Sequence, residues 1–158
     1  MITSEKTMMA LANGSDVRGV AVDGVAGEPV TLSAEAANRI ASGFLDFLAE
    51  RTGKKKSELR IAVGHDSRIS AGALKKAIFS ALTYAGCVAV DCSLASTPAM
   101  FMATVFPETK MDGTIMITAS HLPFNRNGMK FFTKEGGVEH ADIEAILKAA
   151  VRVPEFAG

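Results

Sequence analysis

The sequence predicts an α/β domain with a mixed, mostly parallel four-stranded sheet core between layers of helices. Apolar segments of strand length alternate with segments of helical periodicity along most of the chain. The strand segments "IAV", "CVAV" and "TIMI" are apolar on both faces, as strands covered by helices on two sides must be. The last strand follows its predecessor through a short loop without a helix, so we expect it to run antiparallel.

The elements are expected in the following order. A strand at residues 17–22 turns at Asp23-Gly24 and Gly27 into a second extended segment near residues 29–32, which makes an N-terminal β-hairpin. Ser33 caps the first long helix, Gly53 closes it, and Thr97-Pro98 is the expected cap and first turn of a later helix. Further strands are expected at residues 59–63, 87–90 and 113–118, the last of these being the fourth core strand, with a return strand at residues 129–132. The helices are expected at residues 33–50, 70–85, 97–106 and 143–151.

The composition indicates one globular domain. Of the 158 residues, 48% are hydrophobic and 22% are charged. The 17 basic and 17 acidic residues balance, so no net charge attracts nucleic acid and no nucleic-acid partner is expected. Because no apolar run approaches roughly 18 residues and no signal peptide is recognisable, no membrane partner is expected either. Cys87 and Cys92 should face opposite sides of one strand as reduced thiols, which favours a cytoplasmic location.

Polar residues follow the expected core strand at residues 113–118. Open α/β sheets bind ligands at the carboxyl ends of their parallel strands. Ser120 and His121 come directly after this strand, and Arg126 and Lys130 follow within ten residues. A lone serine here is usually a turn or a cap, but cations nearby favour a nucleophile that handles phosphate, because Arg and Lys donate charge-assisted hydrogen bonds to phosphate oxygens. His121 either contacts phosphate or moves a proton.

Other polar residues have simpler interpretations. Asn127-Gly128 is expected to be a tight turn that returns Lys130 towards Ser120. Asp66 and Arg68 are expected to pair with each other or to cap the next helix. The Walker, dinucleotide-binding and hydrolase-elbow motifs are missing, and no cysteine or histidine cluster predicts zinc.

Four segments, in order along the chain, resemble the α-D-phosphohexomutases, the family that includes phosphoglucomutases and phosphomannomutases. "TASH", followed by Pro123 and by Asn127-Gly128-x-Lys130, resembles the phosphoserine loop of that family. "SDVRG", "VGHDSRIS" and "STPAM" resemble its Asp-x-Arg-Gly, Gly-x-Asp-x-Arg and Thr-Pro segments. The resemblance reaches the first of the family's four domains. It divides the chain into a tail at residues 1–12, domain I at residues 13–152 and the start of an interdomain linker at residues 153–158.

The resemblance implies a phosphoryl exchange. Phosphorylated Ser120 would pass its phosphoryl group to a hexose monophosphate (glucose or mannose phosphate), and the hexose 1,6-bisphosphate would reorient and return one. Mg²⁺ would be bound by the phosphate on Ser120 together with a second domain. The family's metal, sugar and phosphate-clamp loops do not occur in this sequence, so the remaining domains of a parent chain are expected partners and the chain alone is expected to be inactive. The implied catalytic residues are Ser120, His121 and Lys130, with either His121 or Lys130 assisting proton transfer. The implied phosphate or substrate contacts are Arg18, Arg126 and Asn127.

Two alternatives stay open. One is a non-catalytic module that binds sugar phosphates or a partner protein through the same loop. The other is a phosphoserine hydrolase, which is weaker because no base or metal ligand for activating water is visible. Leu122 stands where the family usually has Asn, and this bears on the loop geometry and on substrate preference.

Overall fold

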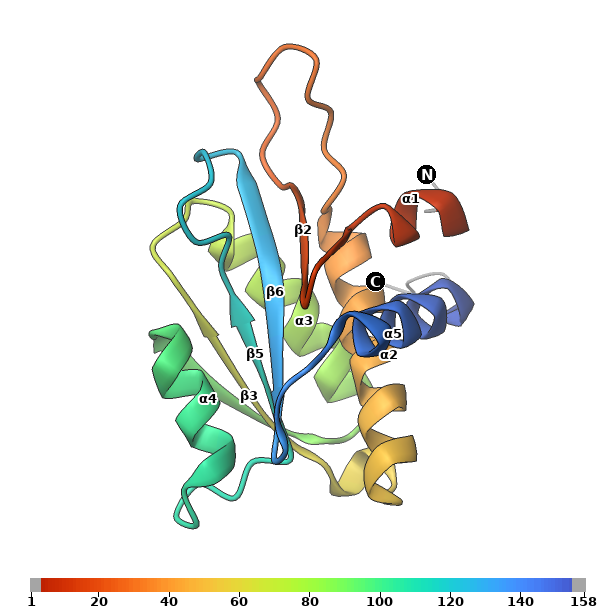
Figure 1. The fold of residues 1–158 in the computed structure, drawn as a ribbon, viewed down its shortest axis with the longest axis vertical. Helices are drawn as coiled ribbons and strands as arrows, with labels where there is room; N and C mark the ends of the chain where they lie inside the picture. Colours follow the sequence, from red (N-terminus) through yellow and green to blue (C-terminus); the bar gives the residue numbers. More distant parts are fainter. Residues whose placement is uncertain (1–3, 155–158) are drawn as a thin grey trace.

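A computed structural model describes residues 4–154 and shows a mixed sheet with helices on both faces (Figure 1). Within these residues, no helix is both long enough and apolar enough to cross a membrane. The strands are β1 (Ala12–Asn13), β2 (Asp16–Val20), β3 (Arg60–His65), β4 (Val88–Leu94), β5 (Gly113–Ile117), β6 (Arg126–Thr133) and β7 (Gly136–Gly137). The helices are α1 (Glu5–Met9), α2 (Ala34–Thr52), the 3-10 turn η1 (Lys56–Glu58), α3 (Ala71–Tyr84), α4 (Thr97–Val105) and α5 (His140–Arg152).

The strands form a single sheet in the order β1-β2-β6-β5-β3-β4, with β7 paired to β6. β3 runs parallel to both β4 and β5, whereas β6 runs antiparallel to β5 and β2. This confirms the predicted mixed sheet between helices and its antiparallel last strand. The short strands β1 and β7 were not predicted, and β2, the predicted strand at residues 17–22, lies beyond β6 in the sheet.

The predicted N-terminal hairpin has the wrong second strand. β2 pairs with β1, which precedes it, and residues 21–33 form a long loop that projects beyond the sheet, drawn in orange in Figure 1. The amides of Thr31 and Leu32 both donate to the single carbonyl of Val20. The returning segment therefore touches the end of β2 and does not run along it.

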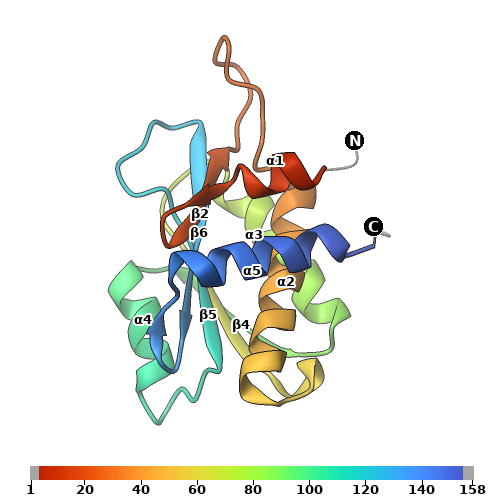
Figure 2. The same ribbon diagram turned by 45° about the vertical axis from the view of Figure 1, so that its right-hand side comes forward.

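The two faces of the sheet carry layers of different thickness. α2, α3 and α5 cover one face, and α4 covers the other (Figures 1 and 2). The larger core lies under the three helices and includes Ile61, Ile115, Met129 and Phe131 from the sheet. The smaller core contains Ala62, Met100, Met111 and Met116.

The burial of β4 and of the N-terminal residues is not what the sequence pattern alone indicates. β4 was expected to be buried on both faces, but it is an edge strand whose Val88 and Leu94 are 45% and 68% exposed. Met8 and Leu11, in the expected N-terminal tail, belong to the larger core. Residues 1–3 of that tail and residues 155–158 of the expected linker lie outside the described residues.

The helix ends agree with the predicted caps at two of three sites. Ser33 Oγ accepts a hydrogen bond from Ala36 N–H, and Gly53 ends α2 in the left-handed conformation at φ 70°. The cap of α4 is Ser96, one residue before the predicted Thr97, because Ser96 Oγ accepts from Ala99 N–H. Ser70 precedes α3 as predicted, but its hydroxyl makes no cap hydrogen bond.

Helices α2 and α5 approach closely at Gly43. A Cβ atom on Gly43 would lie 2.4 Å from the carbonyl oxygen of Ile146 and 2.8 Å from the amide nitrogen of Ala150. Both are backbone atoms, so a larger residue would force the helices apart. The contact between α2 and α5 therefore requires glycine, although glycine is a poor helix former.

Gly43→Ala should destabilise the fold by about 1–3 kcal/mol, because its methyl group overpacks the α2–α5 contact. Gly72→Ala is the matched control, since a Cβ on Gly72 of α3 would meet no atom within 4 Å. The control should be neutral or more stable by up to about 1 kcal/mol. Urea denaturation measures both; a Gly43→Ala variant as stable as the Gly72→Ala variant would contradict the packing account.

Candidate active site

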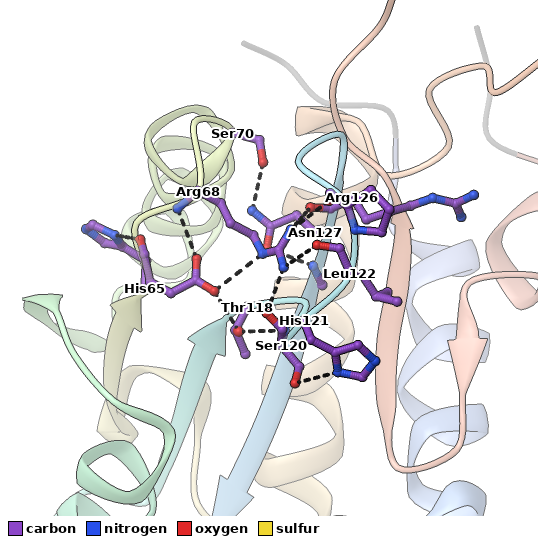
Figure 3. A network of polar contacts seen from close by, with 12 residues as sticks. His65, Arg68, Ser70, Thr118, Ser120, His121, Leu122, Arg126 and Asn127 are labelled. Carbon is purple, nitrogen blue, oxygen red and sulfur yellow. Dashed lines mark hydrogen bonds and ion pairs between the residues drawn. The ribbon is translucent and has the colours of Figure 1, made fainter. Parts of the chain in front are cut away.

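The loop between β5 and β6 presents Ser120 at the carboxyl edge of the parallel strands, as predicted (Figure 3). Ser120 is exposed and has φ 55°, in the left-handed region that a serine seldom adopts. Its N–H donates to Thr118 Oγ1 at 3.0 Å. The turn thus places the hydroxyl outside the sheet while its own backbone stays fixed to the strand end.

Arg68, from the loop after β3, binds the backbone of the Ser120 loop (Figure 3). Its Nη2 donates to the carbonyl oxygens of Ser120 and Leu122, each at 2.8 Å. Its Nη1 donates to those of Pro123 at 2.8 Å and Arg126 at 3.0 Å. The side chain is 11% exposed, so the guanidinium is largely shielded from solvent and links parts of the loop.

Asp66 joins the same network. Its Oδ2 accepts a hydrogen bond from Thr118 Oγ1 at 2.7 Å and lies 3.4 Å from Arg68 Nε. The predicted pairing of Asp66 with Arg68 is confirmed. The sequence interpretation missed the larger role of Arg68, which is to bind four carbonyl groups of the Ser120 loop.

His121 is the side chain next to the Ser120 hydroxyl. Its Nδ1 lies 3.3 Å from Ser120 Oγ, and either atom can donate, depending on the imidazole tautomer. Figure 3 shows the ring beside the hydroxyl on the outer side of the loop. The pair can therefore exchange a proton without further movement of the loop.

Arg18 and Lys130 meet at one buried carboxylate. Asp16, which is 3% exposed, lies directly opposite Lys130 in the β2–β6 ladder. Its Oδ2 is 2.9 Å from Lys130 Nζ and 3.1 Å from Arg18 Nη2. Across residues 4–154, neither cation contacts Ser120 Oγ, so the structure brings the two predicted cations together but not onto the hydroxyl.

The lack of a side chain at Gly128 lets β2 and β6 approach closely beside the Asp16 carboxylate. It pairs with Arg18 across the β2–β6 ladder, and a Cβ atom there would lie 2.3 Å from the carbonyl oxygen of Val17 and 3.2 Å from Arg18 Cγ. Asn127 and Gly128 are consecutive residues of β6, so the predicted tight turn at this pair is wrong. The chain reverses earlier, in the loop that carries Ser120.

Arg126 and Asn127 point elsewhere. Arg126 Nη2 lies 3.0 Å from Glu28 Oε2 in the projecting loop, and its side chain extends away from Ser120 in Figure 3. The hydrogen bond from Asn125 Nδ2 to the same carboxylate, together with the charge of Arg126, lowers the pKa of Glu28. Asn127 is fully buried and donates to Ser70 Oγ at 2.8 Å. Substrate contacts by Arg126 and Asn127 stay predictions.

Side chains of the usual metal-ligand types are not clustered in the part of the chain that the structure describes. Over residues 4–154, no three His, Cys, Asp or Glu side chains are grouped as metal ligands. Near the loop, Asp66 is bound by Thr118, and Asp16 by Arg18 and Lys130. A metal at Ser120 would need oxygen ligands other than these carboxylates.

Surface pockets add little to this site. The larger pocket of about 470 Å³ lies between α2, α3 and the end of α5, and it contains none of the predicted site residues. A smaller pocket of about 350 Å³ has Arg18, Glu28 and Arg126 in its wall, beside the projecting loop. The candidate active site is therefore an exposed loop and not an enclosed cavity.

The fold and the loop define an α/β domain that presents a serine hydroxyl and a histidine at the edge of its sheet. Over residues 10–157 the sequence matches the family described as phosphoglucomutase/phosphomannomutase, alpha/beta/alpha domain I. The chain belongs to this family, as the sequence motifs predicted.

Individual relatives agree with this assignment. The chain is 34% identical to the "Probable phosphoglucosamine mutase" of Methanopyrus kandleri over 75% of its own length and 27% of that protein. It is 36% identical to the phosphoglucomutase/phosphomannomutase of Thermococcus kodakarensis, over 80% of this chain and 26% of that protein. The crystal structure of a phosphoglucomutase/phosphomannomutase family protein from Burkholderia thailandensis aligns with a TM-score of 0.75 and 25% identity, over 90% of this chain and 30% of that chain. The chain thus spans less than a third of each of these relatives.

Asp16→Asn should lower the free energy of unfolding by about 1–3 kcal/mol, because it removes the charge at which Lys130 and Arg18 meet while it keeps the side-chain size. The matched control is Asp23→Asn, an exposed aspartate whose Oδ1 accepts only from the adjacent Gly24 N–H among the described residues. The control should change stability by less than about 0.5 kcal/mol in the same urea titration. Equal effects of the two substitutions would show that the shared carboxylate does not stabilise the fold.

Proposed function

We propose that this chain is the phosphoserine-bearing domain of an enzyme that interconverts hexose 1-phosphate and hexose 6-phosphate. The observation that carries the proposal is the conformation of Ser120. Its hydroxyl is exposed at the ligand-binding edge of the sheet, with His121 Nδ1 at 3.3 Å, while its backbone is held in the left-handed region. The names of the relatives, which are phosphosugar mutases, support the same reaction class.

The reaction would proceed in two transfers at Ser120. In the first, the bond from phosphorus to Ser120 Oγ breaks, a bond to a sugar hydroxyl oxygen forms, and Oγ takes up a proton. In the second, Ser120 Oγ attacks the other phosphoryl group of the hexose 1,6-bisphosphate, the bond from that phosphorus to its sugar oxygen breaks, and the proton that came from the sugar hydroxyl in the first transfer passes from Oγ to this sugar oxygen. His121 lies where it can pass the proton to and from Oγ during the two transfers. Lys130 and Arg18 would supply positive charge for the phosphate groups.

The proposed reaction also requires a metal ion and further domains of the parent protein. Mg²⁺ would offset the charge of the transferring phosphoryl group when it is bound by the phosphoserine and by carboxylates of another domain. The remaining domains of a parent chain would contribute those carboxylates and read the sugar. A cytoplasmic location is also proposed, because Cys87 and Cys92 are both free.

One observation favours a second candidate, a non-catalytic module that binds sugar phosphates. Arg18 and Lys130 already share the carboxylate of Asp16, and Ser120 makes no contact with either cation among residues 4–154. In a mutase, an arriving phosphate must draw these cations towards Ser120. In a binding module, no such movement is needed.

The mutase domain and the binding module predict different effects of adding the remaining domains of the parent protein. The isolated chain should fold, with the circular dichroism of an α/β protein, and should show negligible conversion of glucose 1-phosphate in a coupled assay. Supplying the remaining domains of the parent protein should restore turnover. A folded chain that stays inactive under every such condition would support the binding module, and robust turnover by the chain alone would contradict the proposed division of the site.

Ser120→Ala in the parent enzyme should abolish most turnover and change stability by less than about 1 kcal/mol, because the exposed hydroxyl leaves no buried cavity. Intact-protein mass spectrometry should show a phosphate adduct that maps to Ser120 and disappears in the variant. The control is Ser67→Ala, an exposed serine in the neighbouring loop after β3, which should keep both the adduct and the turnover. An adduct on another residue, or near-normal turnover of Ser120→Ala, would overturn the assignment.

A further inference from the structure

We propose that Arg68 is a positioning residue for phosphoryl transfer, which fixes the backbone of residues 120–126 so that Ser120 faces the reacting phosphate. The inference rests on the proposed function, since it concerns the geometry of the same serine. Arg68 does not approach the Ser120 hydroxyl. It acts through the carbonyl groups of the loop.

The first argument is the number and spread of the carbonyl groups that Arg68 binds. They belong to Ser120, Leu122, Pro123 and Arg126, which together cover the whole reversal from β5 into β6. Three of these carbonyl groups lie in the irregular loop and the fourth, that of Arg126, at the first residue of β6; the Pro123 carbonyl also accepts from Arg126 N–H. The largely buried guanidinium supplies its donors in one fixed plane. Lysine has a single nitrogen and cannot reproduce this planar geometry.

The second argument is the conformation of Ser120. A left-handed serine is unfavourable unless its surroundings hold it there. Both peptide groups of Ser120 are held: its N–H donates to Thr118 Oγ1, and its carbonyl accepts from Arg68 Nη2. Asp66 couples the two contacts, because it accepts from the Thr118 hydroxyl and lies against Arg68. The loop after β3 therefore sets the direction of the Ser120 side chain.

The third argument is electrostatic. Because Arg68 draws four carbonyl oxygens to itself, their negative ends point into the network and not towards a phosphate. The N–H group of His121 donates no hydrogen bond in the part of the chain that the structure describes, which leaves it available to a phosphate oxygen. Free backbone N–H groups next to a left-handed residue commonly bind anions. Arg68 thus fixes the position of Ser120, and it also keeps the negative ends of the loop carbonyl dipoles away from a phosphate on that serine.

The test compares two largely buried arginines in the parent enzyme. Arg68→Lys is the test variant, and Arg39→Lys is the matched control, because Arg39 is also buried and also donates to backbone carbonyls, those of Ala150, Val151 and Val153 at the end of α5. Turnover and thermal stability are measured for both variants, and kcat is expressed per folded molecule. Both should lose stability, but only Arg68→Lys should lose kcat, by about 100-fold with KM changed far less, since misplacing a reacting group by about 1 Å has that effect.

If Arg68→Lys does not fold, a pair of substitutions at Thr118 tests whether turnover requires the Ser120 backbone to be held in place. Thr118→Val removes the hydroxyl that holds Ser120 N–H, whereas Thr118→Ser keeps it, so only the valine variant should lose kcat. Wild-type kcat in folded Arg68→Lys, or in Thr118→Val, would overturn the positioning role. An inactive Ser120→Ala enzyme beside a fully active Arg68→Lys enzyme would reject this inference alone, while an active Ser120→Ala enzyme would reject the proposed function itself.

Discussion

The contact on which the site depends is that of the Arg68 guanidinium with the carbonyl groups of Ser120, Leu122, Pro123 and Arg126. Between β5 and β6 the chain must reverse, and the reversal leaves backbone acceptors without ladder partners. The largely buried Arg68 side chain donates to four carbonyl groups of this segment, and the Pro123 carbonyl also accepts from Arg126 N–H. The exposed serine can then occupy a left-handed conformation at the edge of the sheet while the loop around it stays ordered.

The same contact ties the site to the parallel strands. Arg68 and Asp66 follow β3, and Thr118 follows β5, so the network joins two adjacent strand ends. Asn127 continues it on the far side of the loop, where its buried amide binds Ser70 at the start of α3. The opposite end of the site is built differently, from the ion pairs of Asp16 on β2 with Arg18 and Lys130. The loop geometry is thus fixed by Arg68 with its carbonyl acceptors and Asp66, whereas Arg18 and Lys130 bind the separate carboxylate of Asp16.

Much of this could be predicted from the sequence, because apolar periodicity and capping residues act locally. The four core strands, the caps at Ser33 and Gly53, and the position of Ser120 followed from such signals. The role of Arg68 could not be predicted from the sequence. Its acceptors are backbone carbonyls 52 to 58 residues away, and every residue type has a backbone carbonyl, so no sequence pattern identifies them. Asn127-Gly128 has the composition of a turn, but pairing with β2 keeps it in a strand, so tertiary contacts outweighed the local preference.

A crystal structure of the parent enzyme phosphorylated at Ser120 would test the central claim most directly. The account predicts that Arg68 still donates to the loop carbonyls, and that the phosphoryl oxygens face the His121 N–H with Arg18 and Lys130 drawn towards them. It would be contradicted if Arg68 left the carbonyls to bind the phosphate itself, or if the phosphate were attached to another residue.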